Sequence, residues 1–369
     1  MFKRFHLSSF SRPTLLSMPE QLPNRIDSID IIRGISILMM GQYHFMRWFM
    51  KEGSLSFWLY QLIYIPGRIS APFFLMIAGI SMVMFYNNYK KSGKSLNQIF
   101  TITLKRGIFL LFITIPLNFA ALIIFQSGTI WEWNIFQLLG IGIMFSIFIG
   151  MWNLWFLIPS LTLVFFLNNV LPPSFLTVGI VPIIPWLNYF FVGSIMGIFI
   201  VKFYSQLSRR INYLAIVGVL MYAFTFIHFG FGGWVEVKHV LTERTTLPSM
   251  AIIAFFFIGT ILLTETIKYY PLYFKMNFFK NLGFISLSVY YIHLLYKYAI
   301  VILMRFVGQG NVKVYSGDEY WLLINAGFWI PLFIFVNLIW KPMRFSYGVE
   351  WFMNKYISVR SVISGHSDV

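Results

Sequence analysis

The fold is decided first by residues 25–50, which read Arg25-Ile-Asp-Ser-Ile-Asp-Ile-Ile-Arg-Gly-Ile-Ser-Ile-Leu-Met-Met-Gly-Gln-Tyr-His-Phe-Met-Arg-Trp-Phe-Met50. A stretch of about 20 apolar residues is long enough to cross a bilayer as one helix. Asp30, Arg33, Gln42 and His44 nevertheless lie inside this stretch or at its ends. Ionisable groups in a membrane cost roughly 2.5–3.5 kcal/mol each on insertion scales, so they usually face a bundle interior or a water-filled cavity. We therefore expect the first helix to carry a functional site.

The composition of the whole chain is typical of a protein with many membrane spans. Of its 369 residues, 58% are hydrophobic and only 11% are charged, whereas soluble domains carry roughly 25% charge. The chain contains no cysteine, which excludes disulfides, thiolate catalysis and cysteine-ligated metals. A formal net charge of +16 would suggest nucleic acid as the partner of a soluble protein. Here it fits cytoplasmic loops rich in Lys and Arg.

The hydropathy pattern predicts an all-α, polytopic membrane helix bundle. The ten candidate helices lie at roughly 28–49, 68–88, 107–127, 135–151, 154–171, 179–201, 211–230, 248–267, 283–304 and 319–340. Basic residues concentrate in the segments that would face the cytoplasm, so the positive-inside rule places both termini there. We expect three parts: a basic cytoplasmic N-terminal arm at 1–24, a transmembrane domain at 25–342 and a cytoplasmic C-terminal tail at 343–369.

The first helix contains two candidate functional positions. Asp30 and Arg33 are three residues apart and share one helix face, and the adjacent Gly34 permits close approach of another helix. Alternatively, Arg33 would snorkel to the interface. His44 lies 11 residues further on, about 16 Å along the helix. A neutral imidazole there can take a proton from a hydroxyl or amine; the alternative is a buried histidine that hydrogen-bonds a neighbour.

Two other regions add candidates. The basic segment that contains Lys105 and Arg106 either sets topology and attracts anionic lipid or captures a phosphorylated cytosolic cosubstrate. Arg68 lies at the mouth of the second predicted span, where interfacial arginines are also common. Late in the chain, Tyr290 and His293 are three residues apart and share one helix face. A histidine near mid-membrane is expensive to keep, although a structural hydrogen-bond network would also use it.

These residues resemble the motifs of the transmembrane acyltransferase superfamily. Asp30-Ile-Ile-Arg33-Gly34 followed by His44 is similar to the first-helix motif of the acyltransferase-3 family, and Gly283-Phe-Ile-Ser-Leu-Ser-Val-Tyr-Tyr-Ile-His293 resembles the late-helix motif. Further stretches resemble the branch that contains heparan-α-glucosaminide N-acetyltransferase and its bacterial and archaeal relatives. They are Ala71-Pro72-Phe73-Phe74 through Gly79-Ile-Ser81, Pro185-Trp186 to Gly193, and Tyr347-Gly-Val-Glu350-Trp351. The resemblance runs from about Arg25 to Met353.

The resemblance implies ten or eleven helices around a central pore that acetyl-CoA enters from the cytoplasm. The animal enzymes of this branch look as if they carry a histidine in the loop after the first helix; Lys51 to Gln61 contains none, which shifts the expectation to His44. We expect His44 to deprotonate the acceptor, Gln42 to donate to the developing oxyanion, and Tyr290 and His293 to orient the acyl carbonyl or relay protons. An acyl-histidine intermediate is equally compatible with the sequence. The residues expected to hold the donor are Asp30, Arg33, Arg68, Lys105 and Arg106.

The sequence therefore predicts an integral membrane acyltransferase of the cell (plasma) membrane, dependent on acetyl-CoA as cosubstrate. It would move an acetyl or other short acyl group from cytosolic acyl-CoA to a hydroxyl or amine of a cell-surface glycan or lipid-linked sugar. Expected partners are acyl-CoA, this acceptor and membrane lipids, with a homodimer as one alternative; nucleic acid is not expected. No metal is expected either, because the histidines are scattered and lack paired carboxylates at ligand spacing.

Two rival classes remain open at this point. Buried histidines and an Asp–Arg pair also suit a proton-coupled transporter or flippase of a small polar or lipid-linked molecule, although the sequence shows no inverted repeat. The third alternative is a non-catalytic protein that binds an acylated lipid.

Overall fold

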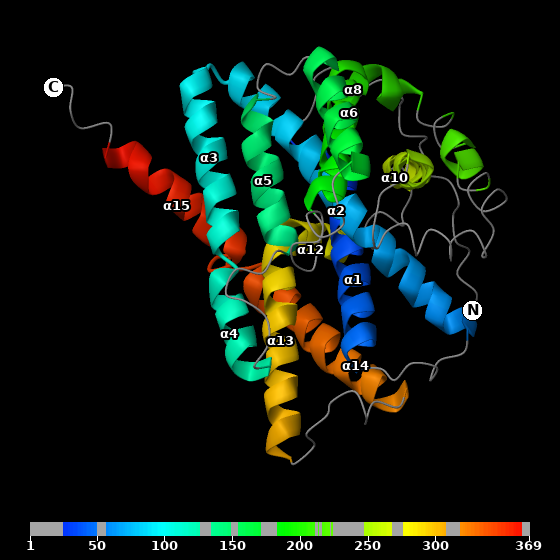
Figure 1. The fold of residues 1–369 in the computed structure, drawn as a ribbon, viewed down its shortest axis with the longest axis vertical. Coiled ribbons are helices and arrows are strands. Elements are labelled where there is room, and N and C mark those ends of the chain that lie inside the picture. Colours follow the sequence, from blue (N-terminus) through cyan, green and yellow to red (C-terminus); the bar gives the residue numbers. More distant parts are fainter. Residues whose placement is uncertain are drawn as a thin grey trace, which may run out of the picture.

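The described part of the chain is helical in a computed structural model, and none of its residues lies in a β-strand (Figure 1). The structure describes residues 25–49, 57–125, 134–148, 154–170, 183–210, 213, 216–221, 223, 247–267, 276–307 and 318–363. The predicted arm at 1–24 lies outside this part. The helices are α1 (Asp27–Phe49), α2 (Phe57–Lys91), α3 (Leu96–Phe112), α4 (Ile115–Phe125), α5 (Ile135–Phe148), α6 (Leu154–Val170), α8 (Ile183–Arg209), α10 (Leu247–Ile267), α12 (Asn277–Phe284), α13 (Ser286–Phe306), α14 (Asp318–Phe335), the π-helical turn η3 (Val336–Trp340) and α15 (Val349–Ile363).

Most predicted helices are present, and the main differences occur at prolines. The helix predicted at 68–88 is longer, because α2 begins at Phe57 and continues through Pro66; Pro72, which already lay inside the predicted helix, is tolerated as well. Membrane helices tolerate proline where neighbouring groups satisfy the freed backbone atoms. The single helix predicted at 107–127 is instead α3 followed by α4. The break follows from Pro116, whose ring would clash with the carbonyl of Phe112, four residues earlier, so α3 ends there.

The later boundaries also differ in part from the prediction. The segment predicted at 283–304 is divided at Ile285, which separates α12 from α13. The C-terminal part contains an additional helix, α15. The helix predicted at 211–230 lies mostly outside the described residues. The count of ten helices therefore stays a prediction.

Five helical segments are long and apolar enough to cross a membrane, judged on the described residues. They are Pro66–Lys91, Leu96–Phe125, Trp186–Leu207, Ser286–Phe306 and Trp321–Trp340. The helix α1 is not among them, because its polar residues, including Asp30, Arg33 and His44, lower its mean hydropathy. It contacts α2, α10, α12, α13 and α14 instead, and most of its side chains are buried. The polar first helix is thus a central helix packed against five others, as expected from its ionisable residues (Figure 1).

The outer surfaces of the surrounding helices are apolar. Exposed large side chains occur on α3, α4, α6, α13 and α14, for example Phe112, Ile123, Phe166, Leu303 and Ile330. Exposed apolar surface of this extent is characteristic of contact with a membrane or a partner. Together with the five long apolar helices, it makes the chain a membrane protein.

Two glycine contacts bring the central helices into backbone contact. A Cβ atom on Gly34 of α1 would lie 1.8 Å from the carbonyl oxygen of Phe279 of α12, and one on Gly283 would lie 1.9 Å from the carbonyl oxygen of Asp30. The close approach predicted for Gly34 is therefore present. A second crossing joins α2 and α8, where a Cβ atom on Gly193 would lie 2.1 Å from the carbonyl oxygen of Met76. These crossings fix the positions of the polar residues on α1 and α2.

Candidate functional site

A cavity of about 550 Å³ lies among α1, α2, α3, α5, the junction of α12 and α13, and the C-terminal segment. Its charged lining residues are four arginines and two carboxylates: Arg25, Arg33, Arg106, Arg344, Asp30 and Glu350. The rest of the wall is largely apolar, with side chains such as Phe74, Met82 and Leu139. The excess of arginine suits an anionic ligand, and the apolar wall suits a ligand that also has an uncharged part.

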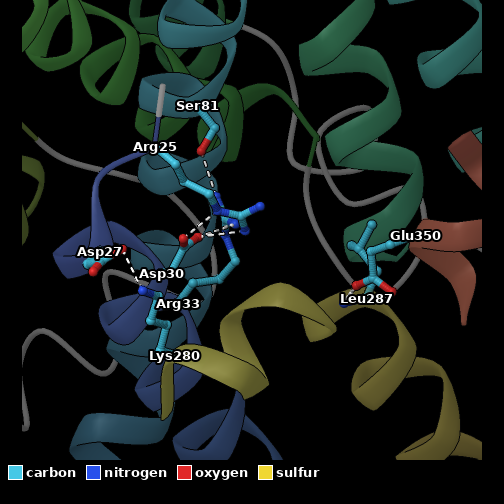
Figure 2. A network of polar contacts seen from close by, with 8 residues as sticks. All are labelled: Arg25, Asp27, Asp30, Arg33, Ser81, Lys280, Leu287 and Glu350. Carbon is cyan, nitrogen blue, oxygen red and sulfur yellow. Dashed lines mark hydrogen bonds and ion pairs between the residues drawn. The ribbon is translucent and has the colours of Figure 1, made fainter. Parts of the chain in front are cut away.

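Asp30 is the centre of a polar network at one side of this cavity (Figure 2). Its carboxylate accepts hydrogen bonds from the guanidinium groups of Arg25 and Arg33. The Nη2 atom of Arg25 lies 2.9 Å and the Nη1 atom of Arg33 lies 3.2 Å from Oδ1 of Asp30. Arg33 also donates to Ser81 Oγ of α2 at 2.6 Å. The predicted Asp30–Arg33 pair is thus present. Because Arg33 bonds across to α2, its guanidinium lies in the interior of the bundle.

The neighbouring contacts hold this network in place. Lys280 Nζ of α12 lies 2.8 Å from Asp27 Oδ1, next to the glycine crossing (Figure 2). The Arg25 guanidinium lies 3.7 Å from the centre of the Phe284 ring, within the range of a cation–π interaction. The first contact joins α1 to α12, and the second joins the residue two positions before α1 to α12. Arg25 and Arg33 are therefore preorganised before any ligand enters.

Arg106 has a buried donor that no protein group satisfies. The guanidinium lies 4.3 Å above the ring of Phe85, but its buried Nε atom has no hydrogen-bond partner. No ion pair to Arg106 occurs within the described part of the chain. A buried donor left without an acceptor is costly. An anionic ligand in the cavity would satisfy it.

Lys105, the neighbouring candidate, points elsewhere. Its Nζ atom donates to the carbonyl oxygen of Ile357 of α15 at 3.4 Å, and Lys105 does not line the cavity. Successive residues leave a helix about 100° apart, and here that turn directs Lys105 toward α15. Of the pair, only Arg106 is placed to meet a ligand there.

The C-terminal segment closes another side of the cavity through Glu350. Its Oε1 atom accepts from the backbone N–H groups of Leu287 at 2.7 Å and Ser288 at 3.3 Å (Figure 2). The Ser288 hydroxyl donates to the other carboxylate oxygen and accepts from Val349 N at 2.7 Å. Glu350 therefore caps the first turn of α13 from a distant segment. Burial raises the pKa of the Glu350 carboxyl above its ordinary value, although these hydrogen bonds oppose the shift.

The turn before α15 carries backbone strain. Arg344, Phe345 and Tyr347 have φ angles of 53°, 55° and 67°, in the left-handed region that non-glycine residues rarely adopt. Arg344 and Phe345 line the cavity, as does Trp351 of α15. Strain of this kind persists where the surrounding structure demands it. The sequence-based interpretation of 343–369 as a tail gave no role to these residues; its only signal was the family-like motif at 347–351.

A histidine pair forms the second part of the candidate site. His44 Nδ1 of α1 lies 2.9 Å from His293 Nε2 of α13. The Trp48 ring stacks on both imidazoles, with centroid distances of 5.0 Å to His44 and 5.5 Å to His293. The Tyr290 ring meets His293 edge-on at 4.8 Å. Three of the four residues predicted to be catalytic are therefore gathered in one cluster.

The contact between the two histidines needs one donor and one acceptor nitrogen. A neutral imidazole has one of each, so either His44 Nδ1–H donates to His293 Nε2 or the reverse. The first arrangement leaves Nε2 of His44 with a free lone pair, as a general base or nucleophile requires.

The remaining predicted residues lie outside both groups. Gln42 is two positions before His44, leaves α1 on roughly the opposite face and hydrogen-bonds neither histidine. Arg68 donates to the hydroxyl of Tyr64 from Nε at 3.1 Å and from Nη2 at 3.0 Å. It is 13 residues before Ser81 on α2, about 20 Å along the helix. Arg68 does not line the cavity.

The cavity and the histidine pair are aligned along two helices. On α1, Arg33 and His44 are 11 residues apart, which returns to nearly the same face after about 16 Å. On α13, Ser286 lines the cavity and His293 follows seven residues later, about 10 Å along the same face. A long ligand with an anionic end in the cavity would therefore extend toward His44.

Comparison with protein families gives one match. Residues 25–224 match the family model for heparan-alpha-glucosaminide N-acetyltransferase, catalytic. The matched part is more than half of the chain and contains α1, α2, α3 and α5, which supply Arg33, Arg106 and His44. The helices α13 and α15, which supply His293 and Glu350, follow it. No curated protein matched the chain in a separate comparison.

Proposed function

We propose that this chain, which belongs to the family of heparan-alpha-glucosaminide N-acetyltransferase catalytic domains, moves an acetyl or other short acyl group from cytosolic acyl-CoA to a sugar. The acceptor atom would be a hydroxyl oxygen or an amine nitrogen of a cell-surface glycan or lipid-linked sugar, and the membrane would be the plasma membrane. The observation that carries the proposal is the alignment of the arginine-lined cavity with the histidine pair along α1 and α13.

The cavity has the chemistry expected for the CoA end of the donor. CoA carries several phosphates at one end and its thioester at the other. Arg106 and Arg344 make no ion pair within the described residues, so they and Arg33 can bind phosphate oxygens. Asn88 and Tyr89, near the end of α2, line the cavity, and the exposed Lys90, Lys91 and Lys94 follow at once. Basic residues favour the cytoplasmic side, which supports donor entry from the cytosol.

The histidine pair has the chemistry expected for transfer. Nε2 of His44 takes the proton of the acceptor O–H or N–H group. The acceptor atom bonds to the thioester carbonyl carbon, the C–S bond breaks, and the proton passes from His44 to the thiolate sulfur. In this step His44 Nδ1–H donates to Nε2 of His293, 2.9 Å away, so His293 acts as a positioning residue. In the alternative route, Nε2 attacks first and the acceptor then cleaves an acyl-histidine.

Calorimetric binding of acetyl-CoA to the detergent-purified protein tests the donor site. Arg106→Ala should weaken binding by about 10- to 150-fold, since hydrogen bonds to charged groups contribute ~1.5–3 kcal/mol. Lys105→Ala is the matched control and should bind like the unmodified protein. Equal losses in both variants would contradict the placement of the donor in this cavity.

Transfer is measured separately, with isotope-labelled acetyl-CoA and glycans extracted from membranes. His44→Ala should keep donor binding and lose transfer of label. If the unmodified protein binds no acyl-CoA of any chain length, the proposed function is wrong, and vesicle assays for a transporter or flippase come next.

A further inference from the structure

On α13 the cavity wall ends about two helical turns before His293. On α13 its wall includes Ser286, and Tyr290 follows one turn later on the same face. On α5 its wall includes Leu139, and Phe136 precedes this residue by one turn. Neither Tyr290 nor Phe136 lines the cavity, and they are only 7% and 0% exposed. Two buried aromatic rings therefore follow the cavity wall in the direction of the histidines.

These two rings contact each other and the histidine pair. The Tyr290 and Phe136 rings meet edge-on at a centroid distance of 5.1 Å. Tyr290 also lies 4.8 Å from the His293 ring and 6.2 Å from the His44 ring. On α1, the side chain one turn beyond Arg33 is Ile37, which is 1% exposed. Three helices thus place apolar, buried side chains between the arginine-lined cavity and the histidines.

From this arrangement we infer that Tyr290 and Phe136 form a barrier that keeps cavity water away from the histidine pair. The inference rests on the proposed function and adds a role for Tyr290 other than contact with reacting atoms. The barrier opens when the thioester arm of the donor displaces the Tyr290 ring. With the arm in place, the only nucleophile that reaches His44 is the acceptor. Tyr290 then determines whether the acyl group goes to the acceptor or to water.

The chemistry of a leak follows from the same atoms. If water reaches Nε2 of His44 from the cavity, His44 takes a proton from it and the water oxygen attacks the thioester carbonyl. The C–S bond breaks, and the proton passes to the thiolate sulfur. The products are the free carboxylic acid and CoA thiol, with no acceptor consumed. Exclusion of water from a reactive centre is a general means to prevent such side reactions.

Release of CoA thiol from acetyl-CoA without acceptor, followed with a thiol-reactive dye, measures this leak. Tyr290→Ala should raise the rate by about tenfold or more over the unmodified protein. Phe136→Ala should raise it less, because it removes only the ring that supports Tyr290. Two variants serve as controls: Tyr290→Phe keeps the aromatic ring, and Tyr291→Ala alters a half-buried neighbour on another face of α13. Neither variant should release CoA thiol faster than the unmodified protein. A Tyr290→Ala variant that binds acetyl-CoA normally and leaks no faster would overturn the inference.

A second measurement needs no enzymatic turnover. The chain has no cysteine, so His44→Cys introduces a single thiol at the histidine site. A water-soluble maleimide should label this thiol about tenfold faster when Tyr290→Ala is also present. A CoA thioether such as S-methyl-CoA, which has no free thiol to consume the maleimide, should block the added labelling when it occupies the cavity. Equal labelling with tyrosine and alanine at position 290 would overturn the barrier. Absence of the CoA effect alone would instead count against the proposed donor site.

Discussion

Gly34→Ala should force α1 and α12 apart at the point where their backbones touch. The added methyl group would lie 1.8 Å from the carbonyl oxygen of Phe279 and 3.0 Å from the amide nitrogen of Gly283. Neither atom belongs to a flexible side chain that can turn away. An ordinary contact begins at 3.4 Å, so the helices must separate by the difference, about 1.6 Å at this crossing.

The expected cost is at the upper end of the range for overpacking, about 3 kcal/mol. A loss of this size corresponds to a fall in Tm of roughly 6–12 °C on the scale of 150–250-residue proteins. The separation also moves Asp30 and Arg33, which flank the crossing, relative to Ser81 on α2. The 2.6 Å bond from Arg33 to Ser81 then lengthens. Affinity for acetyl-CoA should therefore fall together with Tm.

Thermal melting of the detergent-purified protein, with acetyl-CoA binding measured on the same samples, provides the assay. Gly93→Asn is the matched control. Gly93 has a φ of +77° and no atom within 4 Å of an added Cβ, and asparagine tolerates this backbone region better than other side chains. The control should change neither quantity. If Gly34→Ala melts within about 2 °C of the control, below the shift for 1 kcal/mol, the crossing is looser than the contacts indicate.

Three further outcomes follow from the geometry of the site. Burial raises the pKa of Glu350 above 4.5, so the contribution of its carboxyl group to folded stability is complete below pH 4.5 and is lost as pH rises through the raised pKa. Over that pH range Tm of the unmodified protein should fall and Tm of Glu350→Gln should not. Parallel curves of Tm against pH would contradict the raised pKa. Arg68→Ala should leave acetyl-CoA affinity unchanged, since its guanidinium bonds Tyr64 away from the cavity, and a loss like that of Arg106→Ala would place Arg68 at the donor. His293→Ala should lower the transfer rate without changing donor affinity, whereas a rate equal to that of the unmodified protein would remove its positioning role.

Local geometry explains which parts of the site could be predicted from the sequence. The pairing of Asp30 with Arg33 follows from their spacing on one helix, which is fixed by the helical pitch. The small size of Gly34 predicts a close approach in the same way. The contact between His44 and His293 depends on how α1 packs against α13. The sequence therefore indicated both histidines as candidates but did not predict that they contact each other.

Distant packing explains the parts that sequence reasoning did not reach. The apolar span begins at Pro66, so Arg68 stays near its mouth. The helix α2 itself begins at residue 57, however, and so places Tyr64 one turn before Arg68, where its hydroxyl accepts from the guanidinium. The cap of α13 is supplied by Glu350, which is 63 residues from Leu287. Capping is usually local, and no spacing rule links two such positions. The cavity wall at residues 344–354 was missed for the same reason.

The distance along the chain between the two histidines sets an order of events during synthesis. Ser81, which accepts from Arg33, is synthesised 48 residues after it. At ribosomal speeds of about 5–20 residues per second this delay is roughly 2–10 s. His293, which contacts His44, is synthesised 249 residues after it. The His44 ring can therefore make this contact only after a delay of roughly 12–50 s. During that interval α1 must be held by α2 or by the insertion machinery, because its polar residues would otherwise face lipid. Nascent chains that stall between α2 and α13 should therefore be early targets of membrane quality control.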